Sequence, residues 1–256
     1  MTRSPSDSPR YDSTRKAWET IWDSASMDVE LQAVRYPRSM ATIHEYTPYL
    51  LKDDIVLEAG SGLSAVIITL REMGYTVTGL DYAENALHTS RHYDPTLALA
   101  VGDVHALPYA SNSVGAYLSF GVLEHFEHGM VPALEEAYRV VKPGGTLVLT
   151  IPYPNIIQRL IAWRRRGRGS TLNDEDFYES TYTRDILCKA VTDAGFTVEK
   201  AIPTSHAFSL WGLGGPFQGT GYYQTSTLAN VLGSIFRVVL PWAFNFSTLV
   251  IGRKST

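Results

Sequence analysis

The chain has 256 residues, 45% apolar and 19% charged, with a net charge of −4 and a pI near 6.0. This balance argues against a general nucleic-acid-binding protein, which gathers lysine and arginine against phosphate. The only cysteine, Cys188, excludes an intramolecular disulfide and a cysteine-rich metal site, and it fits a reducing compartment. Residues 1–12 are polar and contain no apolar leader, which predicts a disordered tail on a cytoplasmic protein.

Two amphipathic helices are expected ahead of the first strand. Residues 11–26 carry Trp18 and Trp22 at helical spacing, and residues 38–51 show a second helical pattern. We assign residues 13–51 to a helical cap on this basis. The aromatic side chains of the cap could cover a ligand, although such a stripe is more often part of a core.

A short apolar run, an acidic residue and two glycines follow at residues 55–64, which read I-V-L-E-A-G-S-G-L-S. The run is typical of a buried parallel strand, and Gly60 and Gly62 permit backbone angles and a close approach that a side chain would prevent. Residues 63–73 have helical spacing, so free amides at the start of this helix would face the turn. The turn fits a nucleotide-binding fingerprint and, equally, a tight structural turn.

Acidic residues also end the next two expected strands. Asp81 follows the strand at residues 75–80, where it could accept hydrogen bonds from ribose hydroxyls or cap the next helix. Tyr82 could pack on an adenine face. Asp103 follows the strand at residues 97–101, so a second acid stands in the same register as the first.

Strands and helices continue to alternate up to residue 154. Further strands are expected at residues 114–120 and 146–151, with a helix at 131–141 and a sharp Lys-Pro-Gly-Gly turn at 142–145. This alternation predicts a parallel sheet with helices on both faces and ligands at the carboxyl ends of the strands. Residues 52–154 are therefore assigned to a cofactor-binding core.

Two insertions, residues 155–180 and 204–246, interrupt the alternation after the core. The first holds the basic run Arg164–Arg168, which is either a solvated face or a clamp for a phosphate or carboxylate. The second holds the apolar run 228–244, whose polar residues and proline favour burial or an interfacial position over a membrane span. A helix at 182–194 and strands at 196–202 and 247–253 complete a single domain of residues 13–256.

Five motifs occur in order across residues 51–154: L-E-A-G-S-G, G-L-D-Y, G-D-V-H-A-L-P-Y, L-S-F-G-V-L-E-H and E-E-A-Y-R-V-V-K-P-G-G-T-L-V-L. In this order and spacing they resemble the class I S-adenosylmethionine-dependent methyltransferases, in particular the small-molecule, methyltransferase type 11-like group. An NAD-dependent dehydrogenase would explain the first two motifs, but neither Asp103 beside L-P-Y nor the K-P-G-G turn. The chain departs from the family at Ser64, where a third glycine is frequent.

The resemblance implies a Rossmann-like, seven-stranded α/β fold, mostly parallel with an antiparallel last strand, and S-adenosylmethionine as cofactor with S-adenosylhomocysteine as product. It places the methionine part of the cofactor at the glycine turn, the ribose at Asp81 and the adenine at Asp103. A carboxylate such as Glu58 would offset the charge of the sulfonium. The residues implied to bind the cofactor are Glu58, Gly60, Ser61, Gly62, Asp81, Tyr82, Asp103, Val104, Phe120 and Gly121.

His125 is the first candidate for a general base, because an imidazole of pKa near 6.5 can take a proton from a hydroxyl or amine at neutral pH. A packing role with a hydrogen bond to the backbone is the alternative. His128 follows three residues later, but no further ligands accompany the pair, so no metal site is expected. The candidate walls of the acceptor pocket are Trp18, Tyr153, Tyr182 and His206.

The predicted function is transfer of a methyl group from S-adenosylmethionine to an oxygen of a small molecule, such as a sugar or specialised metabolite. A small amine is the alternative acceptor, and a non-catalytic cofactor-binding module that acts through a partner is the alternative of a different class. The expected partner is a small-molecule acceptor and not a nucleic acid. Contact with a membrane that carries a lipid-linked acceptor is the less favoured alternative, and the oligomeric state stays open.

Overall fold

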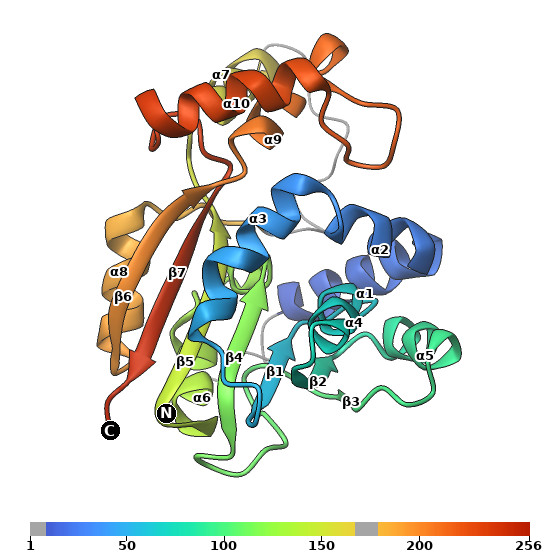
Figure 1. Ribbon diagram of the computed structural model, residues 1–256, viewed down its shortest axis with the longest axis vertical. Helices are drawn as coiled ribbons and strands as arrows, with labels where there is room; N and C mark the ends of the chain where they lie inside the picture. The colour runs from blue at the N-terminus through green and yellow to red at the C-terminus, as the bar shows by residue number, and fades with distance from the viewer. Residues whose placement is uncertain (1–8, 167–178) are drawn as a thin grey trace.

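Seven strands form one sheet in the computed structural model, which describes residues 9–166 and 179–256 (Figure 1). The strands are β1 (Ile55–Ala59), β2 (Thr76–Asp81), β3 (Leu99–Val101), β4 (Val114–Phe120), β5 (Val141–Pro152), β6 (Phe196–Thr204) and β7 (Ser247–Lys254). Their order in the sheet is β3-β2-β1-β4-β5-β7-β6, and all pairs are parallel except those that β7 makes with β5 and β6. The fold class predicted from the sequence is therefore confirmed.

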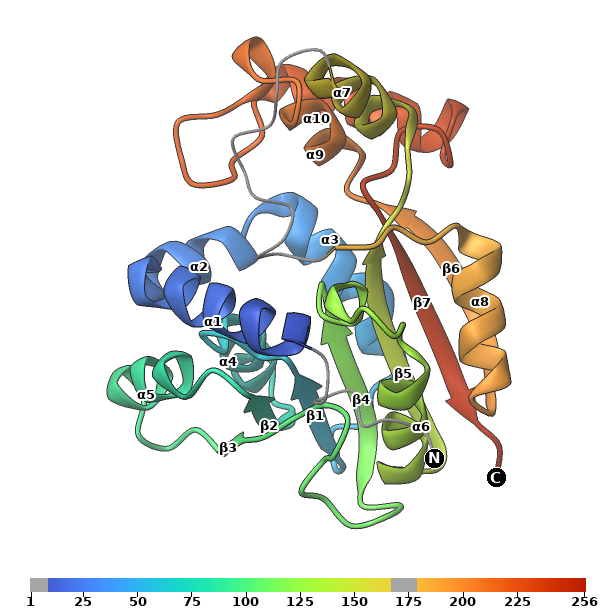
Figure 2. The ribbon, with the colours of Figure 1, turned by 180° about the vertical axis from the view of Figure 1, so that it is seen from behind.

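Helices cover both faces of the sheet. They are α1 (Pro9–Ser24), α2 (Met27–Val34), α3 (Pro37–Tyr46), α4 (Ala65–Glu72), α5 (Glu84–Tyr93), α6 (Val131–Val140), α7 (Ile156–Arg166), α8 (Arg184–Asp193), α9 (His206–Trp211) and α10 (Thr227–Val239). Helices α6 and α8 pack on one face and α3 on the other (Figure 2). Helices α7, α9 and α10 come from the two insertions and gather beyond the carboxyl ends of the parallel strands (Figures 1 and 2).

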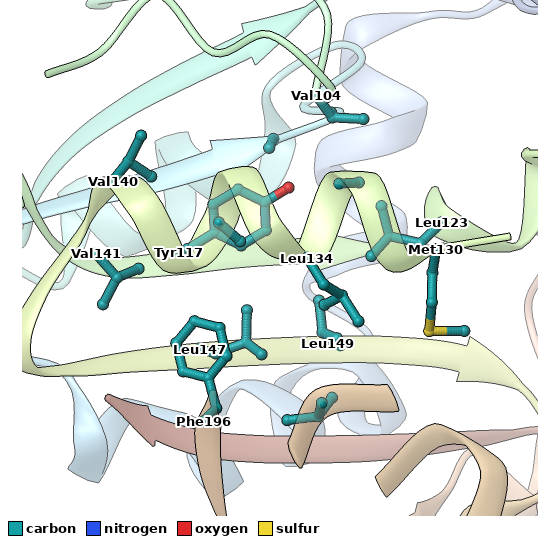
Figure 3. Packing of buried hydrophobic residues seen from close by; sticks show 14 of the residues in the cluster. Val104, Tyr117, Leu123, Met130, Leu134, Val140, Val141, Leu147, Leu149 and Phe196 are labelled. Atoms are coloured by element: carbon teal, nitrogen blue, oxygen red, sulfur yellow. The ribbon is translucent and has the colours of Figure 1, made fainter. Parts of the chain in front are cut away.

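Alternate side chains of β4 enter the two halves of the core. Tyr117 is fully buried and packs among residues of α6 and β5, including Leu134, as Figure 3 shows. Its neighbours Ala116 and Leu118 belong to the opposite cluster, with Tyr46 of α3. Because strand side chains alternate between faces, a shift of one residue would exchange these clusters, so burial fixes the register of β4.

The amino-terminal helix begins earlier than the sequence predicted. Helix α1 starts at Pro9, so residues 9–12 are helical and the predicted disordered tail of residues 1–12 is wrong for them. The physical reason is an anchor, since the Tyr11 hydroxyl donates a hydrogen bond to Asp103, 92 residues away in the sequence. Residues 1–8 lie outside the described part of the chain. Helix α2 follows the first cap helix in the chain and was not predicted from the sequence. It buries Met27 and Leu31 in a cluster with residues of α4 and α5.

Two other boundaries differ for local reasons. The Lys-Pro-Gly-Gly segment is not a separate turn, because β5 begins at Val141 and passes through these residues with a register shift opposite β4. Helix α10 ends at Val239 instead of Phe244, because the residue before Pro241 is disfavoured in a helical conformation. The prediction for the Arg164–Arg168 run concerns side chains that lie outside the described residues.

Ser64 has a left-handed conformation, with a φ of 61°, directly before α4. A β-carbon in this region strains the backbone, and the buried Ser64 hydroxyl has no hydrogen-bond partner among the described residues. We expect Ser64→Gly to raise the free energy of unfolding by about 1 kcal/mol, or the melting temperature by about 3 °C, in calorimetry. Ser64→Ala keeps the β-carbon and is the control. A Ser64→Gly protein that melts with or below the control would contradict this prediction.

Candidate functional site

A cavity of about 220 Å³ lies at the carboxyl ends of β1 and β4. The sheet order reverses at this point, because β2 and β3 extend to one side of β1 whereas β4 and β5 extend to the other. Such a switch point opens a crevice where ligands bind in α/β proteins. The walls of the cavity come from α1, α2, the β1–α4 turn, the end of β2 and the segment that follows β4.

The glycine turn forms the floor of this cavity. Gly60 and Gly62 have φ values of 82° and 48°, so both depend on the conformational freedom of glycine. A β-carbon on Gly62 would lie 2.5 Å from the Trp22 ring. The predicted close approach is therefore real, and in this structure the partner that makes it is an aromatic side chain of α1.

Two residues that line the cavity each have a buried oxygen atom with no hydrogen-bond partner among the described residues. The two atoms are Oε2 of Glu58 and Oγ of Ser61, and both residues are buried. Burial, and then the neighbouring charge of Asp81, hold the pKa of the Glu58 carboxyl well above its usual range, opposed by the Ile67 amide. A buried acceptor of this kind is costly to leave without a donor or a cation.

Asp81 connects the glycine turn to the start of α5. Its Oδ2 accepts a hydrogen bond from the Gly62 amide and its Oδ1 accepts one from the Ala83 amide, each at 2.8 Å. Burial raises the pKa of the carboxyl, and these amides oppose the rise. Asp81 thus lines the cavity, and its carboxylate, which has about four acceptor sites, keeps capacity for a further hydrogen bond.

Asp103 is already engaged on both of its oxygens. Oδ2 accepts a hydrogen bond of 2.6 Å from the Tyr11 hydroxyl, and Oδ1 accepts one of 2.9 Å from the His105 amide and lies 2.8 Å from His105 Nδ1. Burial alone would raise the pKa of the carboxyl, but the hydrogen bonds from His105 and Tyr11 lower it. The assignment of Asp103 to a ligand stays a prediction, and it requires Tyr11 to move or to share this oxygen.

His125 lies in the cavity wall at the end of the 3-10 turn Leu123–His125. Its ring packs edge-on against Trp18, with 5.3 Å between ring centroids, and Trp18 in turn stacks on Trp22 at 5.5 Å. The structure therefore brings the predicted base and one predicted acceptor-pocket residue to the same cavity as the glycine turn. Trp22, whose position in the aromatic stripe of α1 was a usable signal, belongs there too.

Glu124 is a buried acid, whereas the sequence predicts that it points away from the site or caps a helix. Its side chain lies beside Gly121, since a β-carbon there would be 3.6 Å from Glu124 Oε1, and its Oε2 has no partner among the described residues. Burial raises the pKa of its carboxyl to about 8, from an ordinary value of 4.5. Nothing in the E-H dipeptide distinguishes a buried carboxyl from an exposed one, so only the fold could identify it.

Four other predicted residues, Val104, Tyr153, Tyr182 and His206, are not among the residues that line this cavity. Val104 is part of the main core cluster, and Tyr153 packs against Trp242 with ring centroids 5.7 Å apart. The Tyr182 amide donates a hydrogen bond to the Pro152 carbonyl. His206 contacts the Pro241 carbonyl through Nε2, at 2.8 Å, and lines a separate cavity between α3 and α10.

Residues 57–149 match a protein family described as a methyltransferase domain. This range contains the glycine turn, both strand-end acids and the segment after β4. Over this range the chain matches the methyltransferase family that the five sequence motifs predict. The predicted family and the cofactor that this family uses are thereby confirmed, whereas the roles of single site residues stay predictions.

Relatives and solved structures agree with this assignment. The chain is 31% identical over 163 residues to a malonyl-[acyl-carrier protein] O-methyltransferase of Erwinia pyrifoliae, covering 62% of this chain and 61% of the relative. It is 32% identical over 111 residues to a ubiquinone/menaquinone biosynthesis C-methyltransferase of Cereibacter sphaeroides, covering 41% and 43%. A SAM-dependent methyltransferase from Methanosarcina mazei superposes with a TM-score of 0.61 at 18% identity, covering 86% of this chain and 98% of that one. The chain thus spans less than two thirds of these curated relatives.

The residues of the cavity fit this cofactor. The buried, unpartnered oxygens of Glu58 and Ser61 suit a cationic group with hydrogen-bond donors, and Asp81 has acceptor capacity for hydroxyls. Phe120 and Tyr82 supply apolar wall beside them. The methyltransferase domain would therefore hold the polar end of S-adenosylmethionine at the glycine turn.

Glu58→Gln tests this fit. The amide cannot offset a positive charge, so we expect S-adenosylmethionine to bind about thirty-fold more weakly, which is about 2 kcal/mol. The same change removes a buried ionisable group, so the ligand-free variant should melt at or above the wild-type temperature. Titration calorimetry and thermal melts measure the two effects. Unchanged affinity in a folded variant would overturn the placement of Glu58.

Glu124→Gln tests the raised pKa of the buried carboxyl. The folded state keeps the proton between the ordinary value of 4.5 and about 8, whereas the unfolded chain releases it. The free energy of unfolding of the wild type should therefore fall as pH rises through this window, by up to about 1.4 kcal/mol per pH unit from this group. The variant lacks this contribution, so urea unfolding at pH 5 to 8 should give it a shallower fall. Parallel profiles would contradict the assignment.

Proposed function

We propose that this protein is an S-adenosylmethionine-dependent methyltransferase that methylates an oxygen of a small molecule. The observation that carries the proposal is the cavity at the β1–β4 switch point, whose lining residues include Glu58, Ser61 and His125. Buried oxygens of Glu58 and Ser61 have no hydrogen-bond partner among the described residues. The matched methyltransferase domain covers the same residues. Fold and site therefore support the same reaction class.

The bound cofactor supplies an electrophilic methyl group on a sulfonium. The residues of the chain would position the reactants. Glu58 and Asp81 would hold the polar groups, and the stacked Trp18 and Trp22 rings supply an apolar wall of the cavity. Alignment of the two reactants provides much of the acceleration in such a displacement. His125 then takes the proton of a hydroxyl acceptor at its ring nitrogen.

The acceptor atom is the open part of the proposal. The two curated relatives carry the names of an O-methyltransferase and a C-methyltransferase, and the chain resembles both over limited lengths. We favour oxygen because the candidate base in the cavity is an imidazole, which suits a hydroxyl at neutral pH. An imidazole can also take a proton from an amine. A small amine is the second candidate, because the name of neither relative points to nitrogen. The cytoplasmic location stays a prediction from the sequence.

An acceptor screen with the purified full chain tests this function. Binding of S-adenosylmethionine is measured first by calorimetry, and release of S-adenosylhomocysteine is then followed with hydroxyl, amine and activated-carbon acceptors, with products identified by mass spectrometry. Failure of the protein to bind S-adenosylmethionine would refute the proposal. Binding without turnover by any acceptor would support the alternative of a non-catalytic module.

His125→Gln separates a base from a packing residue. With a hydroxyl acceptor found in the screen, we expect kcat to fall by about 10²-fold or more while the affinity for S-adenosylmethionine stays near that of the wild type. Glu124→Gln is the matched variant, because it changes the neighbouring acid. Loss of activity in Glu124→Gln alone would transfer the role of the base to Glu124.

A further inference from the structure

Helix α10 exposes a continuous apolar stripe to solvent. Leu228, Val231, Ile235, Val238 and Val239 are between 46% and 81% exposed, with Val238 at the upper limit. At 100° per residue these positions fall within an arc of about 100° on one side of the helix. We refer to these five residues as the α10 stripe.

The opposite side of α10 fixes the direction of this stripe. Ala229 is fully buried, and a β-carbon on Gly233 would lie 2.6 Å from the Ala207 amide nitrogen, so α10 packs directly on α9. Leu232 and Phe236 join the same cluster. The α10 stripe is therefore not a mispacked inner face, because the helix already has an apolar inner face that is buried.

Helix α7 shows the same two-sided arrangement at the same end of the molecule (Figures 1 and 2). Its inner residue Ile157 packs in the cluster shared with α9 and α10, whereas Ile156, Leu160 and Trp163 are 53%, 37% and 71% exposed. Half of the eighteen exposed large apolar side chains among the described residues lie on α7, α10 and the adjacent Leu240. An exposed apolar surface of this density marks an interaction site.

Charge separates this end of the molecule from the rest of the chain. Residues 153–166 and 204–246 contain five arginines and neither lysine, aspartate nor glutamate, although the whole chain has a net charge of −4. The remainder of the first insertion adds one arginine and four acidic residues, so the two insertions together keep a net charge of +2. Arg159 is exposed on α7, between the apolar residues described above. Apolar stripes with cationic residues and an interfacial tryptophan are typical of helices that lie in the surface of an anionic bilayer.

We propose that α7 and α10 form a docking surface for anionic lipid membranes. The helices would lie in the headgroup region, since among residues 9–166 and 179–256 no helix is long and apolar enough to cross a bilayer. The docked end is the one to which the carboxyl ends of the parallel strands point (Figure 1). The surface therefore orients the cavity end of the domain toward the membrane, and its binding does not depend on methyl transfer.

Vesicle sedimentation with the full chain tests the proposal. We expect the wild type to sediment with vesicles of phosphatidylcholine and phosphatidylglycerol, to bind phosphatidylcholine vesicles much more weakly, and to be released by added salt. Val238→Asp should reduce binding roughly tenfold or more, because it places a charge in the α10 stripe. Leu51→Asp is the matched control, since Leu51 is 64% exposed before β1, at the opposite end of the strands, and should bind as the wild type does.

Arg159→Glu tests whether electrostatic attraction contributes to vesicle binding. It should weaken binding to anionic vesicles and leave the weak binding to neutral vesicles unchanged. The melting temperatures of all variants are compared with that of the wild type, so a folding defect is recognised. A wild type that stays in the supernatant with both kinds of vesicle, or equal binding by Val238→Asp and Leu51→Asp, would overturn the proposal. A dimer without vesicles that Val238→Asp converts to a monomer, with no vesicle binding, would instead assign this surface to a second copy of the chain.

Discussion

The Asp81 carboxylate holds together the two elements that create the site. Through its two hydrogen bonds it ties the glycine turn after β1 to the start of α5 after β2, so the ends of two neighbouring strands keep a fixed relation. The Gly60 and Ser61 amides donate to the Leu80 carbonyl and reinforce the same junction. A cavity with buried, unpartnered oxygens can exist at this point only because the surrounding backbone polar groups are satisfied.

The order of strands and helices could be predicted because each carries a local signal. The boundaries of β4 agree with the prediction at both ends, since Val114–Phe120 is largely buried on both faces and flanked by turn residues. The position of Glu58 and Asp81 at one edge of the sheet could also be predicted, because parallel strands bring their carboxyl ends to one edge. These features depend on short stretches of sequence, and the family resemblance covers the same stretches.

Contacts between distant segments could not be predicted in this way. Nothing in the first twelve residues indicates that Tyr11 reaches Asp103, and the burial of Glu124 depends on how the segment after β4 folds back on the sheet. The apolar run after residue 228 predicted a helix, but its sequence does not say that one half of the apolar surface would be buried on α9 and the other half left uncovered. Such distinctions arise only from tertiary packing.

The bond between Tyr11 and Asp103 makes α1 an internal competitor of any ligand that donates a hydrogen bond to Oδ2 of Asp103. The hydroxyl is part of the same chain, so its effective concentration is set by the flexibility of the first turn of α1 and not by the solution. A ligand that takes the place of this hydroxyl must displace it to enter, and the hydroxyl helps to displace that ligand when it leaves. The first turn of α1 therefore links the residence time of a bound molecule to the local stability of a helix end.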